Sequence, residues 1–406
     1  MSIPTLSILP GNPDFLDLPW EKSVAEWEGD RVVDLPTGVH RHEIVFVSYD
    51  EGLYAIKELP RHLAHHEYDS LRTLREHVRP VAPPVGVVER GWVPPDQEWS
   101  SAVITEFVPF TFTYRELISG GGFGPRRNQL LDAFAGLLVE LHLAGCYWGD
   151  CSLSNVLYRY DAGAVEALMI DAETVELRAE LSDGQRYDDL QIMETNVAGG
   201  MADIAISQGK DLDNADFSLG SDIIQRYEAL WKELMVDPVI SSDERYLIRA
   251  RIHRLNDLGF EVGEVSLVPD GAGGNRVRMK VNVGGRNYHS SRLSRLTRIH
   301  AAENQARQIL SDLHYHRARE PFKSTPTKDL SAMMWRVQVF EPFLDRIRAD
   351  VPHREPVQAY TDFLHHRFLM SSGQGRDVPS AEAYVHWAEA DYPGYSPEEY
   401  GSLDTQ

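Results

Sequence analysis

Five polar residues in three short segments have the types and spacings that chemistry on a phosphate requires. Lys57 ends an alternating stretch, Asp150 and Asn155 are separated by four residues, and Asp171 and Glu173 follow an apolar run. A lysine neutralises phosphate oxygens, an aspartate accepts a hydroxyl proton, and carboxylate and amide oxygens bind magnesium. The combination predicts phosphoryl transfer, with Asp150 as the catalytic residue and Asn155, Asp171 and Glu173 around the metal.

The partner of Lys57 and the role of Glu173 each leave alternatives open. Glu67 lies ten residues after Lys57 at the start of a helical pattern, where it is expected to fix the lysine by an ion pair. Asp69 and Glu76 compete for that role. Glu173 either shares the metal and its water shell or makes structural hydrogen bonds.

The elements that must position these residues change in type near residue 112. Before it, alternating patterns predict a small sheet with one helix against it. The predicted strands are 43–49, 53–57, 85–93 and 102–107, and the helix is 65–77. After it, apolar residues at helical spacing predict helices over 128–143, 187–205 and 222–235, with a strand at 167–170. This order predicts an α+β, two-lobed fold.

Residues 238–242 are a plausible boundary before an additional α/β, mostly helical C-terminal domain. Helices are predicted over 243–258, 301–319, 328–348 and 356–370, and strands over 260–268 and 276–283. The tail after Gly373 is acidic and shows little periodicity. The predicted divisions are an N-terminal extension 1–29, an N-lobe 30–111, a C-lobe 112–238, a basic domain 239–320, and a helical segment with acidic tail 321–406.

Composition limits the class of protein. The 406 residues are 42% hydrophobic and 25% charged, as in ordinary globular proteins. No stretch approaches the roughly 20 apolar residues of a membrane span, and the N-terminus lacks the pattern of a signal peptide. The two cysteines cannot form a disulfide framework. We therefore expect a reduced, cytoplasmic protein.

Charge is distributed unevenly along the chain. The net charge is -22, yet residues 245–319 contain 14 Lys/Arg and 6 Asp/Glu, a balance of +8. This basic region either docks on the acidic remainder or binds a phosphorylated or nucleic-acid ligand. The strand Arg276–Lys280 either binds an anionic group of a substrate or pairs with the acidic first half of the chain. The overall charge makes broad nucleic-acid binding unlikely, while a protein partner stays possible.

The site segments resemble those of a known superfamily. Gly149-Asp150-x4-Asn155-Val156-Leu157 and Ile170-Asp171-Ala172-Glu173 are similar to signatures of the small-molecule and lipopolysaccharide-kinase branch of the protein-kinase-like superfamily. The resemblance covers about residues 33–176. It implies ATP and Mg²⁺ as cofactors, contact of Lys57 with the nucleotide phosphates, and its pairing with Glu67. It also implies an adenine-binding hinge at Glu106 and Val108.

The full chain also resembles an actinobacterial family known as domain of unknown function 4032. The segments Glu303–Arg307 and Phe340–Pro342 carry that resemblance. It implies a kinase-like half joined to a C-terminal domain of its own kind, and it implies no chemistry.

Three departures from the kinase pattern bear on function. The nucleotide loop is reduced to one glycine in 36–40, Trp148-Gly149 precedes Asp150, and the metal triplet is Asp171-Ala172-Glu173. The glycine-rich run 120–124 lacks the Lys-Ser/Thr of a P-loop and predicts a connection. The Trp148-Gly149 pair and the Asp171-Ala172-Glu173 triplet argue against the activation-loop control of ordinary protein kinases.

The preferred hypothesis is an ATP- and magnesium-dependent phosphotransferase acting on a hydroxyl of a small molecule, sugar or glycolipid. The alternatives are a nucleotide-binding pseudokinase whose basic C-terminal domain binds a partner, AMP transfer to a protein, and protein phosphorylation. The reduced glycine loop favours the pseudokinase. The sequence does not identify the acceptor.

Overall fold

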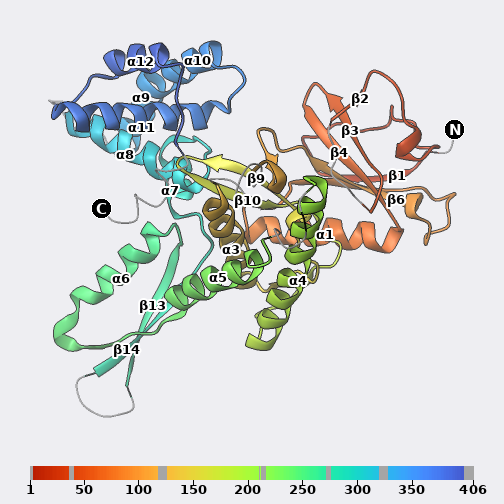
Figure 1. Cartoon of the computed structure of the whole chain (residues 1–406), viewed down its shortest axis with the longest axis horizontal. Helices are drawn as coiled ribbons and strands as arrows, with labels where there is room; N and C mark the ends of the chain where they lie inside the picture. The colour runs from red at the N-terminus through yellow and green to blue at the C-terminus, as the bar shows by residue number, and fades with distance from the viewer. Residues whose placement is uncertain are drawn as a thin grey trace. The chain divides into compact units, whose positions relative to one another are not determined.

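The computed structural model describes residues 3–35, 41–117, 126–209, 211, 216–270, 276–319 and 328–396. The reduced nucleotide loop 36–40 and the glycine-rich run 120–124 lie outside these residues. The chain forms two compact units. The first contains residues 1–123, 130–158 and 167–228, and the second contains residues 124–129, 159–166 and 229–406 (Figure 1).

The first unit begins with a six-stranded antiparallel sheet in the order β1-β5-β6-β4-β3-β2. Its strands are β1 (Thr5–Ile8), β2 (Val32–Val33), β3 (Ile44–Tyr49), β4 (Gly52–Leu59), β5 (Pro84–Glu89) and β6 (Ser101–Glu106). The predicted strands 43–49 and 53–57 are confirmed as β3 and β4, which form a hairpin and pair from Tyr49 with Gly52 to Ile44 with Lys57. The single helix α1 (Arg61–His77) begins four residues before its predicted start.

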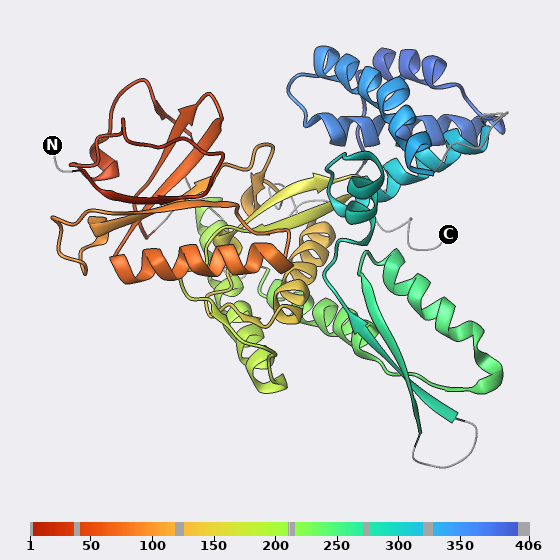
Figure 2. The same ribbon diagram turned by 180° about the vertical axis from the view of Figure 1, so that it is seen from behind.

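The two faces of this sheet bury different side chains. One face packs against the N-terminal segment, whose Phe15, Leu18, Trp20 and Trp27 join a core with strand residues such as Ile56. The other face packs against α1, which lies along the sheet in Figure 2. Strand alternation therefore divides the residues of β4 between the core beneath the N-terminal segment and the side that faces α1.

The rest of the first unit is mostly helical. Its elements are β7 (Phe112–Thr113), α2 (Tyr114–Leu117), α3 (Arg127–Leu143), β8 (Cys146–Tyr147), η4 (Leu153–Asn155), β9 (Val156–Asp161), β10 (Ala164–Met169), β11 (Glu176–Leu177), α4 (Asp183–Ser207) and α5 (Leu219–Met235). The capping box formed by Ser182 and Gln185 fixes the start of α4, four residues before the predicted start. The helices at 128–143 and 222–235 are confirmed within three residues.

The β9–β10 hairpin belongs to both units. Its base, up to residue 158 and from residue 167, is part of the first unit, whereas residues 159–166 are part of the second. At this tip, Ala162 exchanges two hydrogen bonds with Gln358 of the second unit. The Ala162 N–H donates to Oε1 over 2.8 Å, and Nε2 donates to the Ala162 carbonyl over 3.0 Å.

The second unit combines a three-stranded sheet with a set of helices. The sheet has the order β12-β14-β13, formed by β12 (Val239–Ser241), β13 (Val262–Pro269) and β14 (Arg276–Val283). The helices are α6 (Tyr246–Asp257), α7 (Tyr288–Thr297), α8 (Glu303–Arg319), α9 (Lys328–Trp335), α10 (Glu341–Asp350), α11 (Pro356–Gln374) and α12 (Ser380–Glu389). A π-helical turn, Arg336–Phe340, joins α9 to α10, so the helix predicted over 328–348 is interrupted.

Two helices of this unit have no counterpart in the sequence prediction. The sequence of the tail after Gly373 shows little periodicity, but α12 forms there and buries Ala383, Tyr384 and Trp387. Helix α7 is also new. Both helices have only ten residues, so neither presents enough apolar positions to establish a helical period.

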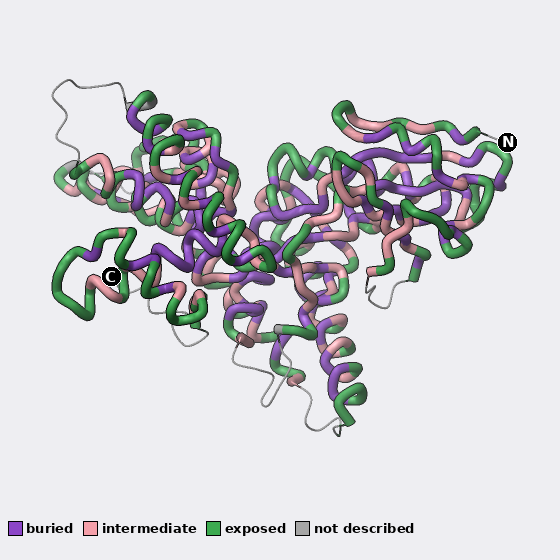
Figure 3. Tube along the Cα trace, turned by 90° about the horizontal axis from the view of Figure 1, so that it is seen from above, coloured by how far each residue is buried: buried purple, intermediate pink, exposed green. Residues whose placement is uncertain are grey.

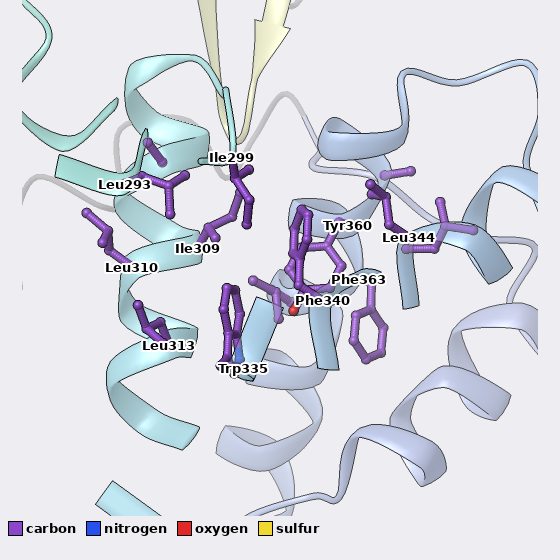
Figure 4. Packing of buried hydrophobic residues seen from close by; sticks show 14 of the residues in the cluster. Leu293, Ile299, Ile309, Leu310, Leu313, Trp335, Phe340, Leu344, Tyr360 and Phe363 are labelled. Atoms are coloured by element: carbon purple, nitrogen blue, oxygen red, sulfur yellow. The ribbon is translucent and has the colours of Figure 1, made fainter. Parts of the chain in front are cut away.

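The helices of the second unit enclose one large apolar cluster. Leu293, Ile299, Leu310 and Leu313 face the aromatic side chains of α9, α11 and the π-helical turn across this cluster (Figure 4). Trp335 is 1% exposed, which shows how completely the cluster excludes water. Figure 3 shows the resulting pattern of buried and exposed stretches along these helices. Within the described residues, no helix is long and apolar enough to span a membrane.

Candidate active site

Lys57 lies near the end of β4 and reaches two carboxylates. Ile56 points into the apolar core, so alternation directs Lys57 to the opposite face, where α1 packs. Its Nζ lies 3.1 Å from Oε2 of Glu67 on α1 and 2.8 Å from Oδ2 of Asp171. The structure therefore brings together the predicted phosphate-binding lysine, its predicted partner and one predicted metal ligand.

Burial and charge act in opposite directions on these three groups. Burial favours the neutral form of Lys57, but attraction by Glu67 and Asp171 outweighs it and raises the lysine pKa. Complete burial raises the pKa of Glu67 to about 7 even though Lys57 opposes this shift. Burial also raises the pKa of Asp171, but Lys57 outweighs that effect and the net pKa is lowered. Asp171 is therefore held as a carboxylate and Lys57 as an ammonium ion.

Glu173 is fixed mainly by a histidine that the sequence analysis did not identify. The Oε2 atom of Glu173 lies 2.8 Å from Nε2 of His42, whose Nδ1 lies 2.8 Å from Glu98. Lys57 is 3.9 Å away from the same oxygen. His42 is buried and stands just before β3. No local pattern marks His42, because its two partners are distant in sequence.

Asp150 and Asn155 form the second part of the site. Asp150 precedes the short η4 turn, and Asn155 is the last residue of this turn, directly before β9. The Nδ2 atom of Asn155 donates to the Asp150 carbonyl over 3.1 Å and to its Oδ2 over 3.4 Å. The turn thus folds the amide back onto the aspartate, as their spacing requires.

Three hydrogen bonds join the two parts of the site. Trp148 Nε1 donates to the Asp171 carbonyl over 3.1 Å, and Thr174 Oγ1 donates to the Trp148 carbonyl over 2.7 Å. The Ile170 N–H donates to the Asn155 carbonyl over 3.0 Å. The segments that carry Asp150, Asn155 and Asp171 are therefore held side by side.

A buried carboxylate on α4 anchors the loop before Asp150. Asp189 accepts the N–H groups of Trp148 and Gly149, each over 2.8 Å, and lies 3.1 Å from Nε2 of His142. Burial raises the pKa of Asp189, but His142 and the two N–H groups outweigh it and lower the pKa. Sequence reasoning missed this residue. The available signal was its place beside Met193 and Val197 on the buried stripe of α4.

Of the two predicted hinge residues, Glu106 is the last residue of β6 and Val108 follows the strand. Glu106 pairs with Tyr54 in the sheet, and its N–H donates to the Pro83 carbonyl. The Val108 carbonyl accepts a hydrogen bond from Thr111. Among the described residues, the Val108 N–H donates to no acceptor. A free backbone N–H of this kind fits the recognition of a purine ring.

The residues present fit ATP and magnesium in three respects. Lys57 has three carboxylates within 3.9 Å, so the site carries excess negative charge that a divalent cation would balance. Asn155 uses its Nδ2 atom for Asp150, and its Oδ1 atom accepts no hydrogen bond from the described residues. The free N–H of Val108 suits the base. In the described part of the chain, no three His, Cys, Asp or Glu side chains form a metal-binding group by themselves.

Comparison with family models divides the chain into two domains. Residues 50–215 match the lipopolysaccharide kinase (Kdo/WaaP) family, and residues 229–391 match the domain of unknown function DUF4032. The second match begins at the residue where the main part of the second unit begins.

The first match places residues 50–215 in the protein-kinase-like superfamily, and the helices and strands of the chain make its fold class α+β. More specifically, the chain combines a kinase-like domain of the lipopolysaccharide-kinase branch with a DUF4032 domain. The kinase-like resemblance inferred from the sequence is confirmed, and the resemblance to DUF4032 is confirmed over residues 229–391.

Solved structures show more distant similarity. A structure of WaaP in complex with acyl carrier protein is 19% identical, with a TM-score of 0.36, and the match covers 56% of this chain and 99% of that one. A Rio2 kinase–ADP/Mg²⁺–phosphoaspartate complex from Chaetomium thermophilum is 15% identical, with a TM-score of 0.27, and the match covers 50% and 71%. No curated protein matches the chain significantly.

Proposed function

We propose that this protein is an ATP- and magnesium-dependent phosphotransferase that acts on a hydroxyl group of a small molecule, sugar or glycolipid. The observation that supports this most directly is the arrangement of Lys57 between Glu67 and Asp171, beside the hydrogen-bonded pair Asp150 and Asn155. The match to a lipopolysaccharide kinase family favours a sugar or glycolipid acceptor.

In this proposal each residue has a separate task. Lys57, held by Glu67, neutralises phosphate oxygens of the nucleotide. Asp150 is exposed, so its carboxylate is free to accept the proton of an acceptor hydroxyl as the new oxygen–phosphorus bond forms. Asn155, Asp171 and Glu173 would hold Mg²⁺, which when bound supplies positive charge against the phosphates. Glu106 and Val108 would meet the adenine.

The test is to incubate the purified full chain with ATP and Mg²⁺, alone and with a panel of sugars and glycolipids, and to identify the nucleotide products. We expect ADP from the wild type. Asp150→Ala should lower product formation by at least about 100-fold, the usual contribution of a general base. Asp171→Ala should abolish it and weaken the dependence on Mg²⁺.

Asp69→Asn is the matched control, because Asp69 is an exposed carboxylate on α1, two residues after Glu67. This variant should retain wild-type turnover. Equal product formation by Asp150→Ala would contradict the assigned role of Asp150. Formation of AMP and pyrophosphate would support nucleotidyl transfer, and ATP binding without product across the panel would support the pseudokinase.

A further inference from the structure

Helix α4 contributes a second polar residue to the loop that contains Asp150. Asn196 lies seven residues after the loop anchor Asp189, which is about two helical turns, or roughly 10 Å. The two residues therefore lie on the same face of α4. This placement brings the Asn196 side chain to the far end of the loop segment that Asp189 holds.

The amide of Asn196 contacts both the side chain and the backbone of this loop. Its Nδ2 atom donates to Oδ1 of Asp150 over 3.0 Å and to the Cys151 carbonyl over 3.2 Å. A carboxamide nitrogen has two hydrogens, so both bonds can form together. Both partners are acceptors only, which fixes the amide with its nitrogen toward the loop.

The two oxygens of the Asp150 carboxylate thus accept hydrogen bonds from two different side chains. Asn155 donates to Oδ2 over 3.4 Å, and Asn196 donates to Oδ1. A carboxylate on an exposed loop otherwise rotates freely about its terminal torsion, which has a broad energy profile. Two donors, one on each oxygen, restrict that rotation.

We propose that Asn196 is a positioning residue that orients the Asp150 carboxylate toward the acceptor hydroxyl. This inference rests on the proposed phosphotransferase function for the direction in which Asp150 must point. A purely structural role explains less, because Asp189 already anchors the loop backbone through Trp148 and Gly149. The bond from Asn196 to the Cys151 carbonyl extends that backbone anchor by one contact, whereas its bond to Oδ1 of Asp150 acts on the orientation of the carboxylate.

The first test is geometric and does not depend on activity. High-resolution crystal structures of the wild type, Asn196→Ala and Gln191→Ala are compared at Asp150. Gln191 is the control, because it is an exposed amide on α4. We expect a single Asp150 orientation in the wild type and in Gln191→Ala, and a rotated or doubled conformation in Asn196→Ala. The same single orientation in all three proteins would overturn the proposal.

The second test separates positioning from stability by kinetics. Asn196→Ala should lower kcat by on the order of 10- to 100-fold, since a small misplacement of a catalytic group has an effect of this size. Its KM for ATP and its Tm should stay close to those of the wild type. Asn196→Asp should be slower than Asn196→Ala, because it places a negative charge against Asp150.

A parallel loss of kcat, ATP affinity and Tm in Asn196→Ala would indicate a structural residue and overturn the proposal. Absence of turnover in the wild type would count against the proposed function. In that case the crystallographic comparison still decides whether Asn196 orients Asp150.

Discussion

Two buried carboxylates, one in each unit, do similar work but differ in pKa. Asp189 accepts the N–H groups of the loop before Asp150, and Asp161 accepts the N–H groups of Asn304 and Gln305 at the start of α8. The pKa of Asp189 is lowered from its ordinary value, whereas that of Asp161 is raised to about 6.

The difference comes from the neighbouring side chains. For both residues, burial is the largest influence and raises the pKa. His142 lies 3.1 Å from Asp189 and, with the backbone N–H groups, outweighs burial. Beside Asp161 the negative charge of Glu166 adds to burial, and the N–H groups together with the positive charge of Arg286 oppose them without outweighing them. Backbone donors therefore hold a buried carboxylate in place, but at Asp189 a hydrogen-bonded side chain able to carry positive charge tips the balance toward ionisation, which the charge of Arg286 does not do at Asp161.

The largest effect is expected from Asp189→Asn. The substitution keeps the shape but removes the charge that faces His142, and it turns an NH₂ group toward a backbone donor. We expect the free energy of unfolding to fall by about 4 kcal/mol, as for a broken buried pair. Guanidinium denaturation of the full chain measures this. Asp188→Asn is the control, because the neighbouring exposed Asp188 bonds only the Tyr147 hydroxyl among the residues that the structure describes. Equal losses in both variants would contradict the comparison.

Asp161→Asn should have an intermediate effect that depends on pH. Because the folded pKa of Asp161 is raised from 3.8 to about 6, its contribution to stability is present below pH 3.8 and is lost as the pH rises through about 6. The asparagine variant lacks this loss. Between pH 4 and pH 7, the difference in unfolding free energy should shift in the variant's favour by roughly 2 kcal/mol.

Chemical denaturation at a series of pH values tests this shift. Asp257→Asn, which removes an exposed carboxylate from α6, controls for the general effect of one charge. A shift toward the wild type with rising pH would show that the N–H groups alone stabilise the charge of Asp161, and the contrast with Asp189 would fail.

Asn304→Ala should have the smallest effect. It removes the 2.9 Å bond from Nδ2 to Asp161 but leaves the backbone N–H bond of the same residue in place. Because Asp161 keeps its bonds to the backbone N–H groups of Asn304 and Gln305, the loss of one side-chain hydrogen bond should cost about 1 kcal/mol of unfolding free energy. Thermal unfolding measures the loss of stability in Asn304→Ala, and Arg307→Ala, which changes an exposed residue of α8, is the control. A loss as large as that of Asp189→Asn would show that side-chain donors dominate at Asp161.

The sequence alone was sufficient to predict contacts between residues that lie close together along the chain. The alternation of β4 and the helical period of α1 place Lys57 and Glu67 on facing surfaces, and the four-residue spacing of Asp150 and Asn155 folds into a single turn. These relations depend on neighbours within about ten residues. The roles of the site residues in catalysis stay predictions.

The sequence alone was insufficient to predict site residues whose hydrogen-bond partners are distant along the chain. Asp189 is 41 positions from Trp148, and His42 is 131 positions from Glu173. Single-sequence patterns report the face of a helix or strand but not what that face meets. A carboxylate on an apolar stripe, as at Asp189, is the one local sign that a buried partner exists.

The β9–β10 hairpin has a practical consequence for dividing this protein. Asn155 precedes β9 and Asp171 follows β10, yet residues 159–166 between them belong to the second unit. The two family domains follow one another along the gene, but their structural units are interleaved. A fragment ending at residue 228 would keep every candidate site residue and leave the Ala162 backbone without Gln358. Isolation of the kinase-like domain therefore requires a redesigned hairpin tip, and recombination at the family boundary would not yield two intact modules.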